Sequence, residues 1–200
     1  MPGHQAGHKA AVLLLFGQAG SGIWASFSDS PEFADAVAHP MDRWSRRVGD
    51  ELAQVLGGKA LFPFEGPPWH PFGRWAQRTE AMQPSPLGIL MHPEYGLWHA
   101  YRFAIVLPGA MPEPSLPVAE PSHACDSCAA RPCLQACPVN AFRDGAYDVA
   151  ACANYLHDNA QAACHRLGCL ARVACPEAGT FSYEPEHRQF HMRQFLASMK

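Results

Sequence analysis

Eight cysteines carry most of the chemistry that this sequence of 200 residues can offer, and all of them lie between residues 125 and 175. They form two groups, each of which ends in Cys-Pro: Cys125, Cys128, Cys133 and Cys137, then Cys152, Cys164, Cys169 and Cys175. The first group is compact, with two, four and three residues between its members. Thiols at such spacing form disulfides, bind zinc or hold iron–sulfur clusters.

The spacing favours iron–sulfur clusters over the other two uses. Disulfides need an oxidising compartment, and no segment of the sequence directs the chain to one. Structural zinc favours two separate Cys-x2-Cys pairs, whereas this chain has one, and zinc gives no reason for a proline after the last cysteine of each group. A cubane cluster presents an iron at each corner, so a compact loop can supply three thiolates while a distant cysteine supplies the fourth.

The Cys-Pro rule predicts how the thiols are divided between two [4Fe–4S] clusters. In two-cluster ferredoxins the cysteine before the proline binds the other cluster. Applied here, the first site takes Cys125, Cys128, Cys133 and Cys175, and the second takes Cys137, Cys152, Cys164 and Cys169. Two departures from the ferredoxin pattern are Arg131-Pro132, an insertion in the first group, and the wide spacing of the second group.

Composition excludes several other classes of function. With 48% hydrophobic and 16% charged residues, the chain is expected to be globular. A net charge of −3 without a basic run argues against a nucleic-acid partner. The apolar run Ala10–Phe16 is far too short to span a bilayer and indicates a buried strand rather than a signal peptide. We therefore expect a cytoplasmic protein with no membrane partner.

The elements that must position the cysteines divide into two halves. Segments 11–16, 59–64 and 98–108 are predicted strands, and 72–82 is a predicted helix. A longer helix is predicted before Gly57-Gly58, with its apolar face formed by Trp44, Val48, Leu52, Val55 and Leu56. We expect an α+β domain over 1–108, a proline-rich linker over 109–122, an iron–sulfur module over 123–180 and a docking helix over 181–200.

The second cysteine group resembles a known type of module. The stretches "YDVAACANYL" (147–156) and "GCLARVACP" (168–176) are similar to the ferredoxin module of epoxyqueuosine reductases and reductive dehalogenases. The resemblance covers about 55 residues and implies a ferredoxin-like module whose clusters lie against a cobalamin-binding domain. It departs at 170–172, where the epoxyqueuosine reductase pattern has a further cysteine, for which Cys164 is the candidate replacement.

The first half resembles a second family. The stretch "SPLGILMHPEYGLWHAYRFAIVLPG" (85–109) is similar to a segment of CblC-type cobalamin-processing proteins, with matches at His92-Pro93, Tyr95, Gly96, Trp98 and Arg102. That resemblance implies a nitroreductase-like β-sheet layer with flanking helices. It also implies binding of cobalamin with its lower base displaced, and removal of the upper ligand by reduction or by transfer to glutathione or another thiol.

These resemblances suggest roles for individual residues, each with a plain structural alternative. Arg102 is a candidate anchor for a carboxylate or amide, or else a strand arginine that faces solvent or pairs with Glu94. His92 is a candidate corrin contact or proton donor, or else a turn residue. The candidate cofactor-binding residues, each also explicable as packing or turn structure, are Tyr95, Gly96, Trp98, Trp69 and Trp75.

The combined prediction is an oxidoreductase that accepts electrons from an upstream donor, passes them through two clusters and reduces bound cobalamin, with loss of an upper ligand. Two alternatives stay open. One is a reductive enzyme like epoxyqueuosine reductase or a dehalogenase that acts through bound cobalamin. The other is an electron carrier without a catalytic pocket, or a protein that binds flavin in place of the corrinoid.

Overall fold

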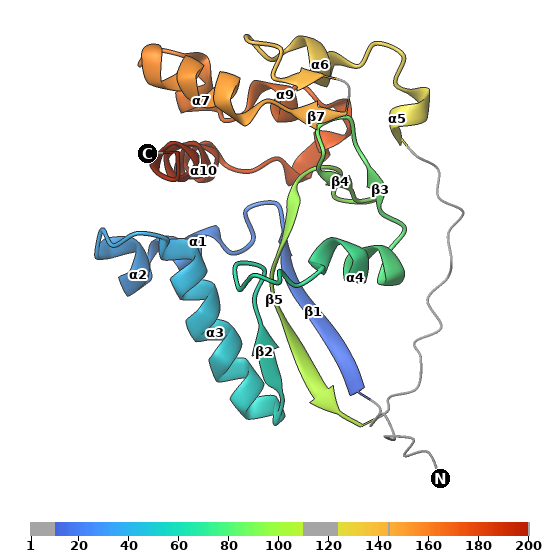
Figure 1. The fold of residues 1–200 in the computed structure, drawn as a ribbon, viewed down its shortest axis with the longest axis vertical. Coiled ribbons are helices and arrows are strands. Elements are labelled where there is room, and N and C mark those ends of the chain that lie inside the picture. Colours follow the sequence, from blue (N-terminus) through green and yellow to red (C-terminus); the bar gives the residue numbers. More distant parts are fainter. Residues whose placement is uncertain (1–10, 110–123, 144, 200) are drawn as a thin grey trace, which may run out of the picture.

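The computed structural model describes residues 11–109, 124–143 and 145–199, which form a mixed α/β fold with small antiparallel sheets (Figure 1). The predicted linker at 109–122 lies outside the described residues except for Gly109. The strands are β1 (Ala11–Ala19), β2 (Lys59–Leu61), β3 (Gln83–Pro84), β4 (Leu90–Met91), β5 (His99–Pro108), β6 (Phe142–Arg143) and β7 (Ala146–Tyr147). The helices are α1 (Trp24–Ser28), α2 (Pro31–Ala34), α3 (Pro40–Leu56), α4 (Phe72–Thr79), α5 (Ala124–Ser127), α6 (Pro132–Gln135), α7 (Val149–Asp158), α8 (Ala163–Leu167), α9 (Leu170–Val173), the 3₁₀ helix η1 (Pro176–Phe181) and α10 (Pro185–Ala197).

The central sheet has the order β1-β5-β2 and is antiparallel throughout. β1 and β5 pair along their whole length, which confirms the two long strands expected from the sequence. β2 is shorter than predicted because the chain turns at Phe62, whose carbonyl accepts the N–H of Glu65. Between Phe16 and Gly17 the register shifts, since their partners are Phe103 and Tyr101, and this leaves Arg102 as the extra residue of a β-bulge.

Helix α3 covers one face of this sheet and ends, as predicted, at Gly57, which has a left-handed backbone (φ 67°). Its buried residues include the small Ser45, Gly49 and Ala53, of which Gly49 lies against the rings of Phe62 and Phe103. Val48 and Leu52 pack against the same core, as predicted. Val55 was expected on the apolar face but is 81% exposed. It lies about 200° around the helix from Ala53, and therefore points away from the sheet. Leu56 is also exposed.

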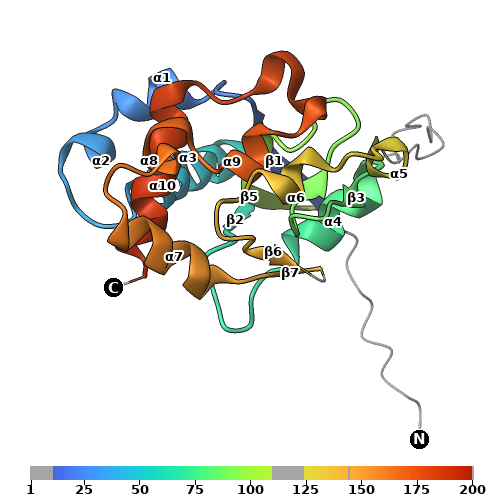
Figure 2. The ribbon, with the colours of Figure 1, turned by 90° about the horizontal axis from the view of Figure 1, so that it is seen from above.

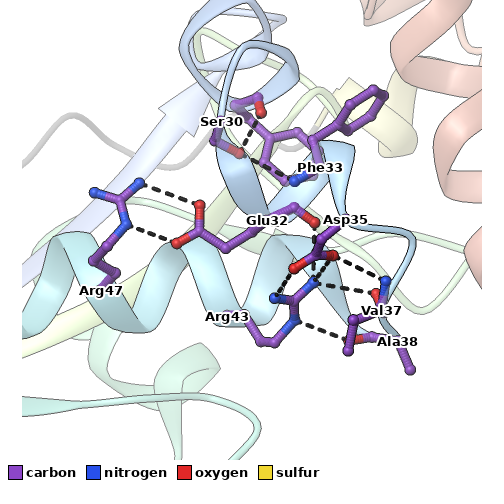
Figure 3. A network of polar contacts seen from close by, with 9 residues as sticks. Ser30, Glu32, Phe33, Asp35, Val37, Ala38, Arg43 and Arg47 are labelled. Carbon is purple, nitrogen blue, oxygen red and sulfur yellow. Dashed lines mark hydrogen bonds and ion pairs between the residues drawn. The ribbon is translucent and has the colours of Figure 1, made fainter.

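A polar network joins α2 to α3 beside an aromatic cluster (Figure 3). Arg47 makes two hydrogen bonds to Glu32, the shorter at 2.6 Å, and lowers the pKa of that carboxyl. Arg43 binds Asp35 with both terminal nitrogens at 2.7 Å. Ser30 caps α2 by accepting the N–H of Phe33. The network holds the α1–α2 segment against α3, where four aromatic and sulfur-containing side chains form a core: Phe27, Met41, Trp44 and Phe190.

The cysteine-bearing half shares its core with the first half. Leu87, Met91 and Leu97, from the hairpin β3–β4 and the turn after it, pack with Cys137 and Cys175. The closing helix expected from the sequence is α10, which packs against α7 and α8 (Figure 2). Phe190 on α10 enters the aromatic cluster of α1 and α3. The cysteine segment is therefore covered on one side by the hairpin and on another by α10.

The helix expected at 72–82 ends earlier, at Thr79, and its C-cap Glu80 is extended. None of the helices in the described part of the chain combines the length and the apolar character that a bilayer crossing requires.

Candidate functional site

The first predicted set of thiols lies around one cavity. Cys125, Cys128, Cys133 and Cys175 line it together with hairpin residues that include Leu87, Met91 and Leu97. The cavity itself is small, about 20 Å³, and it opens to solvent. Burial raises the pKa of the Cys125 and Cys175 thiols, and neighbouring thiols of the same set raise both further. Three thiols come from the α5–α6 segment, and Cys175 arrives from the end of α9.

The second predicted set of thiols gathers between α7, α8 and α9. Cys152 lies on α7, Cys164 on α8 and Cys169 at the start of α9, while Cys137 follows α6. Burial raises the pKa of Cys152, Cys164 and Cys169, and the cysteines that add to each shift all belong to this set. Met192 and Phe195 of α10 pack against this set.

Polar groups lie close to several of the thiols. In the second set, the Ala141 N–H donates to the Cys137 Sγ at 3.3 Å. The nearby Tyr147 hydroxyl lowers the pKa of Cys152, and backbone N–H groups lower those of Cys164, Cys169 and Cys175, in each case against the larger effect of burial.

The chemistry of the donor set fits two four-thiolate clusters better than a single metal ion. All eight cysteines are free thiols. Within the described residues, no three side chains of His, Cys, Asp or Glu are close enough together to hold one ion. A cubane takes each thiolate on a different iron, so its ligands stand farther apart than those of one ion. Two groups of four free thiols have the number and type of ligands that two such clusters would need.

The turn that holds His92 lies beside the first thiol set, and its imidazole is already occupied. His92 Nδ1 accepts the N–H groups of Glu94 and Tyr95 at 3.0 and 3.1 Å, and its ring stacks on Tyr95 at 4.2 Å. Nε2 lies 3.4 Å from a carboxylate oxygen of Glu80. Gly96 has φ +55°, and a Cβ atom there would collide with the carbonyl of Glu177, two residues after Cys175. The turn therefore fits tightly against the cysteine segment.

Arg102 and Trp98 lie at the junction of the two halves. The β-bulge places Arg102 near Tyr183 and Asp42, and burial lowers the pKa of its guanidinium. The Nε of Arg102 and the Nε1 of Trp98 are buried and have no hydrogen-bond partner within the described residues. Trp98 is 1% exposed, and the guanidinium of Arg172 lies over its ring at 4.4 Å. Arg102 is therefore half-buried rather than fully exposed, and within the described residues it forms no ion pair with Glu94.

The sequence analysis missed the aromatic and imidazole side chains around Arg102. The His187 ring stacks on Tyr183 at 4.1 Å and on Trp24 at 4.8 Å. Its Nδ1 lies 3.1 Å from the Ser21 hydroxyl and its Nε2 lies 3.1 Å from His191 Nε2. Burial, followed by the charge of Arg102, lowers the pKa of His187 to about 4. Burial and His187 lower the pKa of His191 to about 3.

The spacing of this pair in "HRQFH" (187–191) places both imidazoles on one face of a helix, which is a signal that the sequence did contain. The two other tryptophans predicted to bind the cofactor, Trp69 and Trp75, lie elsewhere. Trp69 is 63% exposed, and Trp75 on α4 contacts Phe72 and His70. Trp98 and Arg102 both lie close to Tyr183, whereas the contacts of Trp75 are with Phe72 and His70, and Trp69 is exposed. Two open hollows lie at the far end of the sheet, around Gly58 and Lys59.

Comparison with known proteins adds no relative. No model of a protein family, no curated protein sequence and no solved structure matches this chain. The two sets of thiols and the junction beside them are therefore the features from which its function has to be inferred.

Proposed function

We propose that this chain is an iron–sulfur oxidoreductase that holds two [4Fe–4S] clusters in a ferredoxin-like module and passes their electrons to an acceptor at the sheet. One observation carries the proposal: eight free thiols gather in two sets of four, and burial raises the pKa of thiols in both sets. The first set is Cys125, Cys128, Cys133 and Cys175, and the second is Cys137, Cys152, Cys164 and Cys169. When bound, such clusters supply single electrons at low potential.

The residues around the thiols would shield the clusters from water and stabilise their charge. The hairpin residues Leu87, Met91 and Leu97 exclude water from the first set, and Met192 and Phe195 do so for the second. Backbone N–H groups stabilise the negative charge on the sulfurs. The side chain of Arg172 reaches from α9 to the Leu97 carbonyl and over the rings of Trp98 and Tyr183, so it connects the module to the sheet.

For the acceptor we propose a corrinoid bound against a nitroreductase-like sheet, with reductive removal of an upper axial ligand. The support is two of the five buried polar side-chain atoms that lack a partner in the described residues, the donors Arg102 Nε and Trp98 Nε1. Buried donors are nearly always paired, so a bound molecule with acceptor oxygens would account for both. In this proposal Arg102 anchors the acceptor and Trp98 walls its site, while Tyr95 and Gly96 shape the neighbouring turn.

A specific observation also favours the second candidate, an electron carrier without its own catalytic pocket. The nitrogens of His92 already face partners, and Trp69 and Trp75 lie away from Arg102. The structure therefore does not bring together all the residues that the resemblance to cobalamin-processing proteins predicted around the cofactor. Two other acceptors fit the same proposal of two clusters. One is a flavin, and the other is a substrate reduced through bound cobalamin, as in epoxyqueuosine reductase.

The test is to measure how much iron and sulfide the protein binds after it has been purified without oxygen and reconstituted with both. We expect about eight irons and eight sulfides per chain, in keeping with two cubanes. Hydroxocobalamin or flavin is then added, and the protein is separated from the free cofactor. Retained cobalamin that the reduced protein converts to Co(II), with a requirement for Arg102 in an Arg102→Ala variant, supports the corrinoid proposal. Filled clusters with neither cofactor retained support the carrier, and a protein that holds zinc instead of iron overturns the whole proposal.

A further inference from the structure

A chain of hydrogen bonds leads from Ser21 to His191 at the junction of the two halves. The Ser21 hydroxyl lies 3.1 Å from His187 Nδ1, and His187 Nε2 lies 3.1 Å from His191 Nε2. The Glu184 N–H donates to the same hydroxyl oxygen at 2.8 Å. Ser21 is partly exposed, whereas His187 is fully buried. The chain therefore runs from the surface into the interior.

Ring contacts place the inner end of this chain beside the proposed acceptor site. The Tyr183 ring stacks on that of His187 at 4.1 Å and lies 5.7 Å from the His191 ring. The other neighbour of Tyr183 is Trp98, at 5.1 Å, whose buried Nε1 has no partner in the described residues. Within that same part of the protein no hydrogen bond takes up His191 Nδ1, so this nitrogen is the open end of the chain.

The contact between the two imidazoles fixes how they share protons. A neutral imidazole has one N–H and one nitrogen with a free lone pair, and the bond between two Nε2 atoms holds a single proton. If His191 donates it, His187 carries its own proton on Nδ1 and donates to Ser21. If His187 donates it, Ser21 donates to His187 Nδ1, and His191 carries its proton on Nδ1. The two rings are therefore always in opposite tautomers, and a proton can pass along the chain by switching both.

The surroundings keep both imidazoles neutral, as such a transfer requires. Burial, followed by the positive charges of Arg102 and Arg172, lowers the pKa of His187 to about 4. Burial, followed by His187 and the same two arginines, lowers the pKa of His191 to about 3. A protonated imidazole has no lone pair and cannot accept a proton, so neutral rings are the ones that conduct.

The same pair of nitrogens could also suit a metal ion, but its neighbours argue against one. Imidazole nitrogens four residues apart on a helix are common metal ligands. Within the described residues, however, no third His, Cys, Asp or Glu side chain joins them. The charged groups that act on both rings are Arg102 and Arg172, which would repel a cation. The arrangement therefore favours a shared proton over a metal.

We infer that Ser21, His187 and His191 form a proton relay from solvent to the acceptor site, and that His191 hands over the proton. The inference rests on the proposed function. If the upper ligand is cyanide, one electron from a cluster breaks its bond to cobalt, and the departing anion takes the Nδ1 proton of His191 to leave as hydrogen cyanide. His187 then reprotonates His191 at Nε2, Ser21 reprotonates His187 at Nδ1, and water reprotonates Ser21. Both rings turn over before the next proton passes.

The first test needs no acceptor. Nitrogen NMR of the reconstituted full-length chain, labelled at its imidazoles, reports which ring nitrogen carries the proton. The signals are assigned by their loss in His187→Gln and His191→Gln. At pH 7 we expect two neutral rings with complementary tautomers, the share of Nδ1–H in one equal to the share of Nε2–H in the other. Equal tautomers or a protonated ring would overturn the relay, as would displacement of both Nε2 signals by one equivalent of Zn²⁺.

The second test measures the proton transfer itself. Reduced protein is mixed with cyanocobalamin, and the release of cyanide is followed in water and in deuterium oxide. His191→Gln should slow the release at least about 10-fold and abolish the solvent isotope effect of the wild-type protein. Ser21→Ala, which interrupts only the resupply, should slow repeated turnovers more than the first. The matched control is Ser28→Ala, because the Ser28 hydroxyl donates to the Ala25 carbonyl and lies outside the chain.

The two tests separate failure of the relay from failure of the proposed function. If His191→Gln binds both clusters and cyanocobalamin and releases cyanide like the wild-type protein, with the same isotope effect, the relay is overturned. If the wild-type protein holds no iron and sulfide, or does not retain cyanocobalamin, the proposed function fails and the delivery of a proton to that acceptor fails with it. Complementary tautomers would still be observed in that case, so the two failures are distinguishable.

Discussion

The thiol sets and the predicted acceptor wall were both expected from sequence, and the structure assembles them to different degrees. Each set of four thiols gathers at one place. Of the residues predicted to line the acceptor site, Trp98 and Arg102 both lie close to Tyr183, while Trp69 is exposed. The two predictions used different information. The thiols were grouped by their spacing in the sequence, whereas the lining of a binding site depends on tertiary packing that no short motif specifies.

The largest expected effect tests the division of the thiols. Cys175→Ser should abolish the first cluster and leave the second, so that bound iron falls to about half. Cys137→Ser should have the same effect on the second cluster, although Cys137 is close in sequence to the ligands of the first. The electron paramagnetic resonance signals of both variants are compared with those of Cys125→Ser and Cys152→Ser. If Cys137→Ser removes the same signal as Cys125→Ser, the interleaved division is wrong.

A second prediction concerns the imidazoles that surround Arg102 where the sequence predicted a corrinoid wall. The pKa of His187 is about 4 in the folded chain, against about 6.5 when unfolded, so the unfolded chain binds more protons between these values. Stability is therefore highest above pH 6.5 and falls as the pH drops towards 4, by ~3 kcal/mol for this residue. His187→Gln should flatten the dependence of Tm on pH between 5 and 7. An equal slope in both proteins would assign the dependence to other groups.

A third prediction concerns the turn that joins the two regions. Gly96→Ala places a side chain at φ +55° and against the carbonyl of Glu177, so it should cost about 1–3 kcal/mol of unfolding free energy. Because the turn covers the first thiol set, the variant should also lose that cluster faster in air. Gly73→Ala on α4 is the control, since helical alanine there has room and should stabilise slightly. Urea unfolding and the decay of cluster absorbance provide the two readouts.

The smallest effect on stability is expected at Arg102, and it decides whether an acceptor site exists. Replacing a half-buried guanidinium, whose Nε has no partner within the described residues, by an apolar chain of similar length should leave the unfolding free energy unchanged or raise it by ~1 kcal/mol. Arg102→Met should nevertheless weaken acceptor binding at least about 10-fold, since it removes a charged hydrogen bond. Tm and cobalamin titrations measure the two. A strongly destabilised variant would show that Arg102 holds the fold together rather than a ligand.

Much of the framework followed from patterns in the sequence, with physical limits that particular residues illustrate. β1, β5, α3 and α10 were expected because their apolar repeats are long and Gly57 terminates α3. Val55 was misplaced because the buried residues of α3 include small ones, which a hydrophobic pattern overlooks. His187 was missed because its role depends on tertiary contacts with Ser21, Trp24 and Tyr183. None of these three residues belongs to the helix of His187, and Ser21 and Trp24 are far from it in sequence. The division into domains stays a prediction.

The interleaving of the two proposed ligand sets has a consequence for biosynthesis. Cys137 is synthesised with the first group but serves the second site, and Cys175 is synthesised last but completes the first. Neither site has all four ligands until Cys169 and Cys175 have left the ribosome, whereas the hairpin β3–β4 that covers the first set is made long before. On this division, cluster insertion would have to wait for Cys169 at the second site and for Cys175 at the first.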